Sequence, residues 1–144
     1  MQRLSWYGVI LAGMLSSSTN GHAEPVFDPC PDRPNCVSSL ATGTRHFIEP
    51  LHFSDEPGRA WARLKAVLHQ QPRTRIVAEQ GDYLRAECRS LVFRFVDDVE
   101  FVMQPQQQQI QVRSASRNGY SDLGVNRRRV ERLREQFTKA KPPG

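Results

Sequence analysis

The chain has 144 residues, of which 24% are charged, and a formal net charge of +5. This length corresponds to one domain, large enough for a hydrophobic core that needs neither a metal nor many disulfides. Between Arg113 and Arg134, seven arginines accompany two acidic residues, so the rest of the chain is nearly neutral. The sequence contains no P-loop, no dinucleotide-binding glycine pattern and no Gly-x-Ser-x-Gly element, which leaves nucleotide-dependent and serine-hydrolase functions without a motif.

The N-terminal segment is typical of a secretory signal peptide. Arg3 precedes the apolar stretch LSWYGVILAGML, and the polar spacer SSSTNG leads to Gly21 and Ala23, the small residues of a cleavage site. The apolar stretch is short for a bilayer, which takes about 20 apolar residues, and no later segment comes closer. We therefore predict that residues 1–23 are removed near Ala23. The mature protein would begin at Glu24, without a transmembrane helix, in the periplasm or outside the cell; an uncleaved anchor is the alternative.

Residues 24–53 are expected to form an irregular arm that packs on the domain. The stretch DPCPDRPNC places three prolines within nine residues, which interrupts regular structure. Its loop can bring Cys30 and Cys36 to the Cα separation of about 4.4–6.8 Å that a disulfide requires, and disulfides persist in an oxidising compartment. We predict that bridge. The less favoured alternative is a nucleophilic Cys36 with His46 or His52 as its base.

A first helix is predicted near residue 54. Ser54 or Asp55 offers an N-cap, Pro57 fits the first turn, and apolar residues recur at helical spacing until Pro72 stops the run. One face of this helix is expected to lie on a sheet, through Trp61, Leu64, Val67 and Leu68.

The middle of the chain is predicted to form β-strands. The stretches RIVAE and YLRAECR flank Gly81, which indicates a hairpin. Alternation along the second strand places Cys88 on the inward face as a buried free thiol and Glu87 on the outward face. Next comes LVFRFVDDVEFVM, either as one long strand bent at Asp97 and Asp98 or as two strands joined there. IQVRSAS forms the last strand.

A second helix is predicted from about Leu123, with Val130, Leu133 and Phe137 on its apolar face. The order helix, four or five strands, helix predicts a single α+β domain over 54–140. Its antiparallel sheet of four or five strands is flanked in sequence by the two helices and covered on one face.

Three motifs occur in the order CPDRPNCVSS, FRFVDDVEF and VRSASRNGYSDLGVNRRRVERLR. Together they resemble the bacterial and plant family called domain of unknown function 1499 (DUF1499), over nearly the whole mature chain. The resemblance implies no catalytic residue, because the family has no established one to carry over. Asn118 and Cys88 depart from the family pattern, so neither is expected to have a family-wide role.

The arginines near the second helix are expected to divide into two groups. Asn126 shares the apolar side of the helix, so Arg128, Arg129 and Arg132 are expected to point toward water and to pair with nearby acids. Arg127 begins the helix instead, where its charge adds to the positive end of the helix dipole.

Cations at a helix N-terminus destabilise it unless an anion offsets them. We predict that acidic side chains supply part of the offset, and that a bound anionic group between Arg117, Arg127 and the turn from Gly119 to Gly124 supplies the rest. The alternative is that these arginines bond only to Asp and to backbone carbonyls and hold the fold. The candidate ligand-binding residues are Arg113, Arg117, Tyr120, Asp122, Arg127, Asp97, Asp98 and Glu87.

Asp97 and Asp98 are expected to act separately. Adjacent strand residues point to opposite faces, which disfavours a carboxylate pair that shares one site for general acid–base catalysis. One of the two acids is predicted to pair with an arginine of the basic segment, and the other to meet water or a turn amide.

These patterns favour a secreted or periplasmic, non-enzymatic module that binds an anionic small molecule, a lipid headgroup or an acidic protein surface. No cofactor is implied, and the cysteines and scattered histidines match no zinc-ligand spacing. Nucleic acid is not an expected partner, because the arginines lack interleaved aromatic residues and a secretory protein does not meet cellular nucleic acid. The alternatives are a hydrolase-type enzyme that uses Glu87, Asp97 or Asp98 beside the arginines, and a purely structural envelope protein.

Overall fold

The computed structural model describes residues 27–91 and 93–140. The predicted signal peptide and its cleavage site lie outside these residues. In chain order, the elements are β1 (Cys36–Ser38), β2 (Leu51–His52), α1 (Pro57–Gln70), β3 (Thr74–Gln80), β4 (Tyr83–Arg89), β5 (Val96–Gln104), the short 3-10 helix η1 (Pro105–Gln107), β6 (Gln109–Ser116) and α2 (Val125–Lys139).

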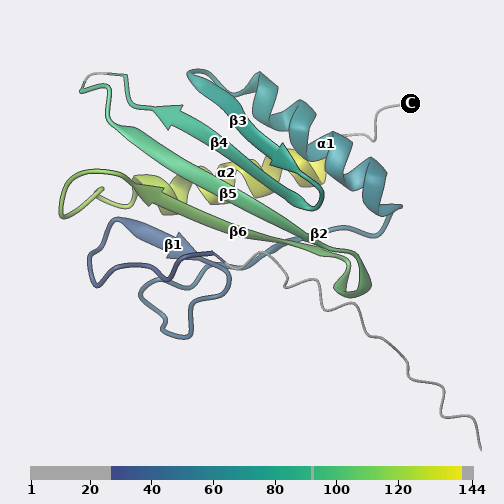
Figure 1. The fold of residues 1–144 in the computed structure, drawn as a ribbon, viewed down its shortest axis with the longest axis horizontal. Helices are drawn as coiled ribbons and strands as arrows, with labels where there is room; N and C mark the ends of the chain where they lie inside the picture. The colour runs from purple at the N-terminus through teal and green to yellow at the C-terminus, as the bar shows by residue number, and fades with distance from the viewer. Residues whose placement is uncertain (1–26, 92, 141–144) are drawn as a thin grey trace, which may run out of the picture.

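The strands form one antiparallel sheet in the order β1–β6–β5–β4–β3, with β2 also paired to β6. The strands β3 to β6 form the predicted meander, and Gly81 turns its first hairpin with a φ of 56°. The sheet has six strands instead of four or five. Its additional strands, β1 and β2, come from the segment before α1, which runs beside β6 in Figure 1.

The strand β5 continues through Asp97 and Asp98, which pair with Cys88 and Glu87 of β4. The chain therefore does not turn at the two aspartates. It turns earlier, in the β4–β5 loop (Ser90–Phe95), where the backbone N–H of Ser90 donates to the Phe95 carbonyl at 2.9 Å.

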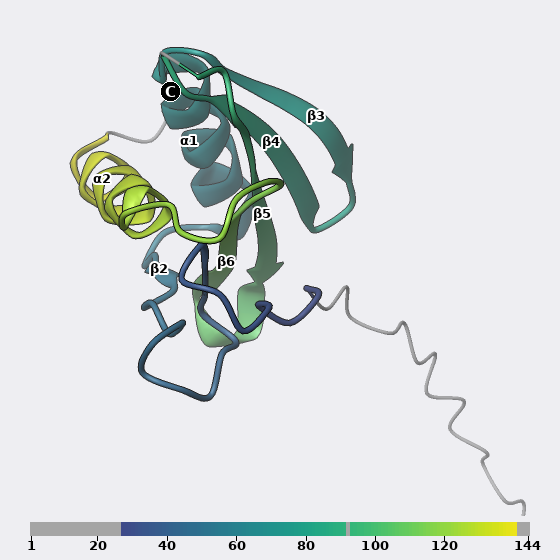
Figure 2. The same ribbon diagram turned by 90° about the vertical axis from the view of Figure 1, so that its left-hand side faces the viewer.

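Both helices cover the same face of the sheet (Figure 2), as the apolar patterns predict. The core contains the expected helix residues together with large side chains from the strands, namely Leu64, Val67, Leu68, Val130, Leu133, Phe137, Leu84, Phe101 and Ile110. The N-cap of α1 is Glu56, whose carboxylate accepts from Arg59 N–H, and not Ser54 or Asp55. Asp55 instead accepts from Arg63 at 2.5 Å and 3.0 Å.

Candidate functional site

Asp97 and Asp98 lie on opposite faces of β5, as adjacent strand residues should. Asp97 faces α2, is 4% exposed, and accepts a hydrogen bond from Arg129 at 2.5 Å. Asp98 lies on the open face of the sheet and accepts from Arg117 at 2.7 Å and 2.8 Å. Both acids therefore pair with arginines of the basic segment, where only one was expected to do so.

Arg129 points inward, so the expectation that it faces water is wrong. Its side chain is 16% exposed and also donates to the side-chain oxygens of Asn126 at 2.8 Å and Ser114 at 3.2 Å. Arg129 follows Asn126 by three residues and so lies on the same side of the helix. From there its long side chain reaches the carboxylate of Asp97. Arg132 is exposed, as predicted.

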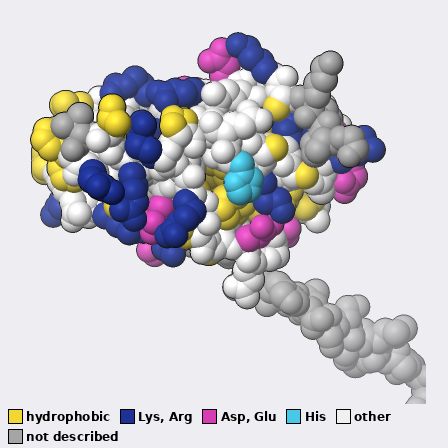
Figure 3. Space-filling model, turned by 90° about the horizontal axis from the view of Figure 1, so that it is seen from above, with side chains coloured by type: hydrophobic (Ala, Val, Ile, Leu, Met, Phe, Trp, Pro, Cys, Tyr) yellow, Lys and Arg dark blue, Asp and Glu magenta, His cyan; other side chains and the backbone are white. Residues whose placement is uncertain are grey.

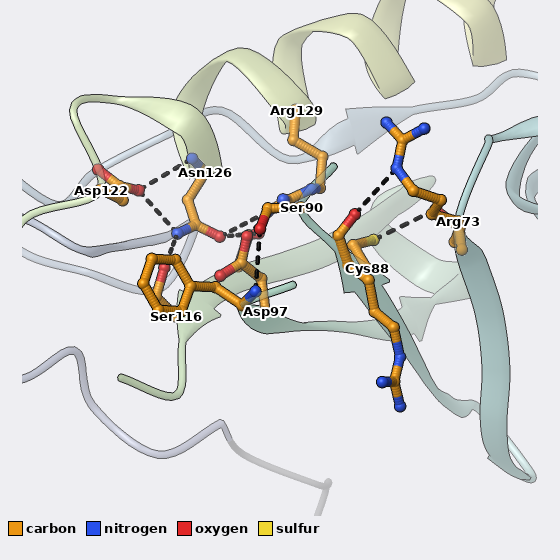
Figure 4. A network of polar contacts seen from close by, with 12 residues as sticks. Arg73, Cys88, Ser90, Asp97, Ser116, Asp122, Asn126 and Arg129 are labelled. Carbon is orange, nitrogen blue, oxygen red and sulfur yellow. Dashed lines mark hydrogen bonds and ion pairs between the residues drawn. The ribbon is translucent and has the colours of Figure 1, made fainter. Parts of the chain in front are cut away.

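Asn126 is the centre of a buried polar network (Figure 4). Its amide nitrogen donates to Asp122 at 2.7 Å and to Ser116 at 2.9 Å, and its oxygen accepts from Ser114 at 2.5 Å. Asp122 also accepts from the backbone N–H groups of Gly124 at 2.8 Å and Asn126 at 2.9 Å. The carboxylate that offsets the dipole of α2 thus belongs to the protein itself.

Two ion-paired rows lie on the open face of the sheet. Arg117 donates to Glu87 at 2.5 Å as well as to Asp98, and these hydrogen bonds lower the pKa of both carboxyl groups. In the next row Arg113 donates to Glu100 at 2.8 Å. Glu87 and Asp98 are therefore ionised at neutral pH, and neither has the raised pKa that a general acid requires.

Arg117 and Arg127 do not converge on one group. Arg127 donates to the carbonyl oxygens of Phe47 at 2.8 Å and Arg45 at 3.1 Å, which fastens the segment before α1 to α2. Tyr120 lies in the β6–α2 turn, 67% exposed. The structure therefore distributes the predicted site residues among the buried network, the open sheet face and this helix contact.

The cysteines are arranged as predicted. Cys30 and Cys36 form a disulfide with a Cα–Cα distance of 5.6 Å. Cys88 is a free thiol, 6% exposed, and its burial raises its pKa. Because the thiolate is the reactive form, burial disfavours reaction of Cys88 in the folded protein.

A pocket of about 180 Å³ lies where the C-terminal end of α1, the first residue of β3, the last residues of β4 and the N-terminal half of α2 meet. Hydroxyl and amide groups of Thr74, Ser90 and Gln71 line it, and Cys88 belongs to its wall. Among the described residues that line the pocket there are four arginines and no carboxylate, and the arginines are Arg73, Arg89, Arg129 and Arg132. We call this the arginine pocket.

Two of the four arginines of the arginine pocket lack a counter-charge among the described residues. Arg129 is neutralised by Asp97, but Arg73 donates from Nε to a carbonyl oxygen, at 3.2 Å. Arg89 shares the open face of β4 with Glu87, which it approaches to 3.8 Å, so its guanidinium lies on the face of the sheet opposite the helices. Arg132 is exposed and makes no ion pair with any carboxylate in the part of the chain that the structure describes. The guanidinium groups of Arg73 and Arg132 are therefore the two at the pocket that have no carboxylate partner among the described residues.

A family model described as "Protein of unknown function (DUF1499)" matches residues 27–137. The chain belongs to the DUF1499 family. This confirms the resemblance that the three sequence motifs indicated. Among curated proteins, none matches the sequence significantly. The matched range of this DUF1499 protein extends from the segment before α1 into α2, and so contains both the disulfide and the arginine pocket.

Sequence reasoning did not find the arginine pocket, because its arginines come from separate elements. A partial signal existed in the hairpin, where Thr74 pairs with Cys88 and so brings Arg73 and Arg89 to the same end of the sheet. The contribution of Arg132 depends on how α2 packs over that end, which the sequence pattern does not specify.

Two further observations concern the described residues. Within 27–91 and 93–140, no group of three or more His, Cys, Asp or Glu side chains is placed to hold a metal ion. The same ranges include no helix whose length and apolar character would allow it to span a bilayer.

Proposed function

We propose that this DUF1499 protein is a non-enzymatic binding module of the periplasm or the cell exterior, and that it holds an anionic group in the arginine pocket. The observation that carries the proposal is the gathering of four arginines around one pocket, without a carboxylate among its described lining residues. Guanidinium groups suit phosphate and carboxylate because their planar N–H donors match the oxygens of these groups in pairs.

The other lining residues fit the same kind of ligand. Ser90 offers a hydroxyl donor, whereas the Thr74 hydroxyl and the Gln71 amide already donate to other groups of the protein. The neutral thiol of Cys88 places no negative charge in the wall. The pocket, at about 180 Å³, is smaller than the roughly 300–1,000 Å³ of sites that enclose a whole small molecule. It therefore suits one phosphate or carboxylate group of a larger ligand.

The hydrolase alternative receives less support from the geometry. Its candidate acids are Glu87, Asp97 and Asp98, and none of the three is among the lining residues of the arginine pocket. Each is bound by an arginine, and Glu87 and Asp98 lie on the open face of the sheet, away from the helices.

The proposal also reassigns the arginines. Arg113, Arg117 and Arg127 bond to side chains or carbonyls of the protein and stabilise the fold. Arg73 and Arg132 supply the ligand contacts instead.

Thermal unfolding of the full chain in inorganic phosphate, compared with chloride at equal ionic strength, tests the proposal. Phosphate at about 100 times its dissociation constant adds about 2.7 kcal/mol to the stability, which raises the Tm of a domain of this size by about 10 °C. We expect this rise in the wild type and its loss in the double variant Arg73→Gln with Arg132→Gln.

The matched control is Arg59→Gln. Arg59 is exposed in the first turn of α1, whereas the pocket lies at the C-terminal end of that helix. Phosphate also stabilises proteins by exclusion from their surfaces, but that contribution is common to all variants. The proposal is overturned if the double variant and the control respond to phosphate equally.

A further inference from the structure

Two loops that leave the sheet at the same end carry large exposed apolar side chains. They are the β4–β5 loop (Ser90–Phe95) and the β6–α2 turn (Arg117–Gly124). Arg117 N–H donates to the carbonyl of Val96, the first residue of β5, at 3.1 Å, which brings the end of one loop beside the start of the other. Of the eight large hydrophobic side chains that are exposed in the described residues, six belong to these loops or to the adjoining first residue of α2. They are Leu91, Phe93, Phe95, Tyr120, Leu123 and Val125.

The fold holds these side chains outward. Leu123 is 83% exposed and has a φ of 52°, a left-handed conformation that costs a leucine about 1–2 kcal/mol. It persists because Asp122 binds the N–H groups that follow, and because Arg128 donates to the Leu123 carbonyl at 2.8 Å. In the other loop the rings of Phe93 and Phe95 stack with centroids 5.6 Å apart. Single exposed apolar residues are ordinary, whereas a gathered set marks an interaction surface.

The charge at this end is positive. Figure 3 shows hydrophobic side chains gathered at the left end of the molecule, with Lys and Arg side chains beside them. The β4–β5 loop contains Arg94 and no acid, and the only acid between Arg117 and Arg129 is Asp122, which is engaged by the N-terminus of α2. An apolar tip surrounded by arginines complements a partner that is anionic at its surface and apolar beneath it.

We infer that the two loops insert into an anionic lipid bilayer, with a lipid phosphate as the group that the arginine pocket takes. The inference rests on the proposed function and names its ligand. Aliphatic and aromatic side chains inserted at the headgroup boundary, with arginines at the phosphate level, are the combination by which peripheral proteins bind anionic membranes.

The pocket and the loops are positioned to act together. Val125 is both an exposed apolar residue and a lining residue of the pocket. Ser90 lines the pocket too, and its hydroxyl accepts from Phe95 N–H at 2.9 Å. A phosphate in the pocket therefore lies beside the loops that contact the acyl region. An acidic protein surface would satisfy the arginines, but two separate protruding apolar tips suit a deformable partner better than a fixed one.

Sedimentation of the full chain with lipid vesicles tests the inference. We expect binding to vesicles of mixed phosphatidylglycerol and phosphatidylcholine, and at least tenfold weaker binding to phosphatidylcholine alone. The double variant Phe93→Ser with Leu123→Ser should bind the anionic vesicles at least tenfold more weakly than the wild type. The control Leu40→Ser, which removes an apolar side chain exposed at 44% outside the two loops, should bind as the wild type does.

A second measurement reports insertion directly. In Phe93→Trp, brominated phosphatidylglycerol should quench the additional tryptophan emission relative to the wild type. Absence of vesicle binding, unchanged binding in the Phe93→Ser with Leu123→Ser variant, or an unquenched Phe93→Trp would each overturn the inference. The inference would also be overturned if the wild type self-associates and the Phe93→Ser with Leu123→Ser variant does not, because the surface would then bind a second copy of the chain.

The two proposals fail separately. The Phe93→Ser with Leu123→Ser variant leaves the arginine pocket intact, so it should keep the rise in Tm with inorganic phosphate even after it loses vesicle binding. If inorganic phosphate does not raise the Tm of the wild type, the proposed function itself is refuted.

Discussion

Replacing Arg129 by methionine is expected to be the most destabilising change among the arginines of α2. The substitution leaves the carboxylate of Asp97, 4% exposed, without the guanidinium that binds it, and removes hydrogen bonds to Asn126 and Ser114. Removing one partner of a buried ion pair costs about 3–5 kcal/mol. Arg129 retains 16% exposure, so water screens part of the pair and we expect a loss of about 3 kcal/mol.

Urea unfolding followed by circular dichroism measures this loss as a fall in the free energy of unfolding. The control is Arg128→Met on the same helix, whose exposed guanidinium donates to the Leu123 carbonyl and whose loss should cost no more than about 1 kcal/mol, the net value of one hydrogen bond. Adding Asp97→Asn to Arg129→Met removes the unpaired charge and should recover at least about 1 kcal/mol, because contacting groups are energetically coupled. Equal stability of the Arg129→Met and Arg128→Met proteins would refute this account of the buried pair.

Three further predictions concern the cysteines and the open sheet face. Cys88 should react with a thiol reagent only after denaturation, since it is buried; labelling of the native protein at the rate of a free thiol would contradict this. Replacing Cys30 and Cys36 by serine should lower the free energy of unfolding by about 2 kcal/mol, because the bridge closes a short loop, and an unchanged urea midpoint would show that the bridge adds no stability. Glu87 and Asp98 have lowered pKa values in the folded protein. Their contribution to the free energy of unfolding is therefore present above their pKa values in the unfolded chain, about 4, and is lost as the pH falls through their pKa values in the folded protein. The urea concentration at the midpoint of unfolding should therefore decrease when the pH is lowered below about 4, and it should decrease less in Arg117→Gln. Identical pH profiles for the two proteins would show that the ion pairs of Arg117 are not the cause.

The parts of the fold that sequence predicts well have strong periodic signals. Alternation placed Cys88 on the buried face of β4, and helical spacing placed Val130 and Leu133 in the core. Each of these assignments depends on residues within one element, whose geometry fixes the relative directions of their side chains.

The predictions that failed depend on contacts between different elements, which the pattern within one element does not specify. The strands β1 and β2 have three and two residues, too few for a periodic pattern, and they exist because β6 offers them an edge. The helical pattern assigns Arg129 to the solvent together with Arg128 and Arg132, although its position three residues after Asn126 lets its long side chain reach Asp97. The arginine pocket depends on the approach of α2 to the β3–β4 hairpin, a tertiary contact without a local signal.

The division of the arginines into those that hold the fold and those that hold a ligand is the central claim. Its most direct test is a titration of the full chain, labelled with 15N-arginine, with inorganic phosphate, in which the Nε–H signals are followed by NMR. We predict that the signals of Arg73 and Arg132 shift in a saturable way, while those of Arg113, Arg117 and Arg127 stay in place. Saturable shifts confined to the second group, or equal unsaturable shifts of all arginines, would contradict the claim.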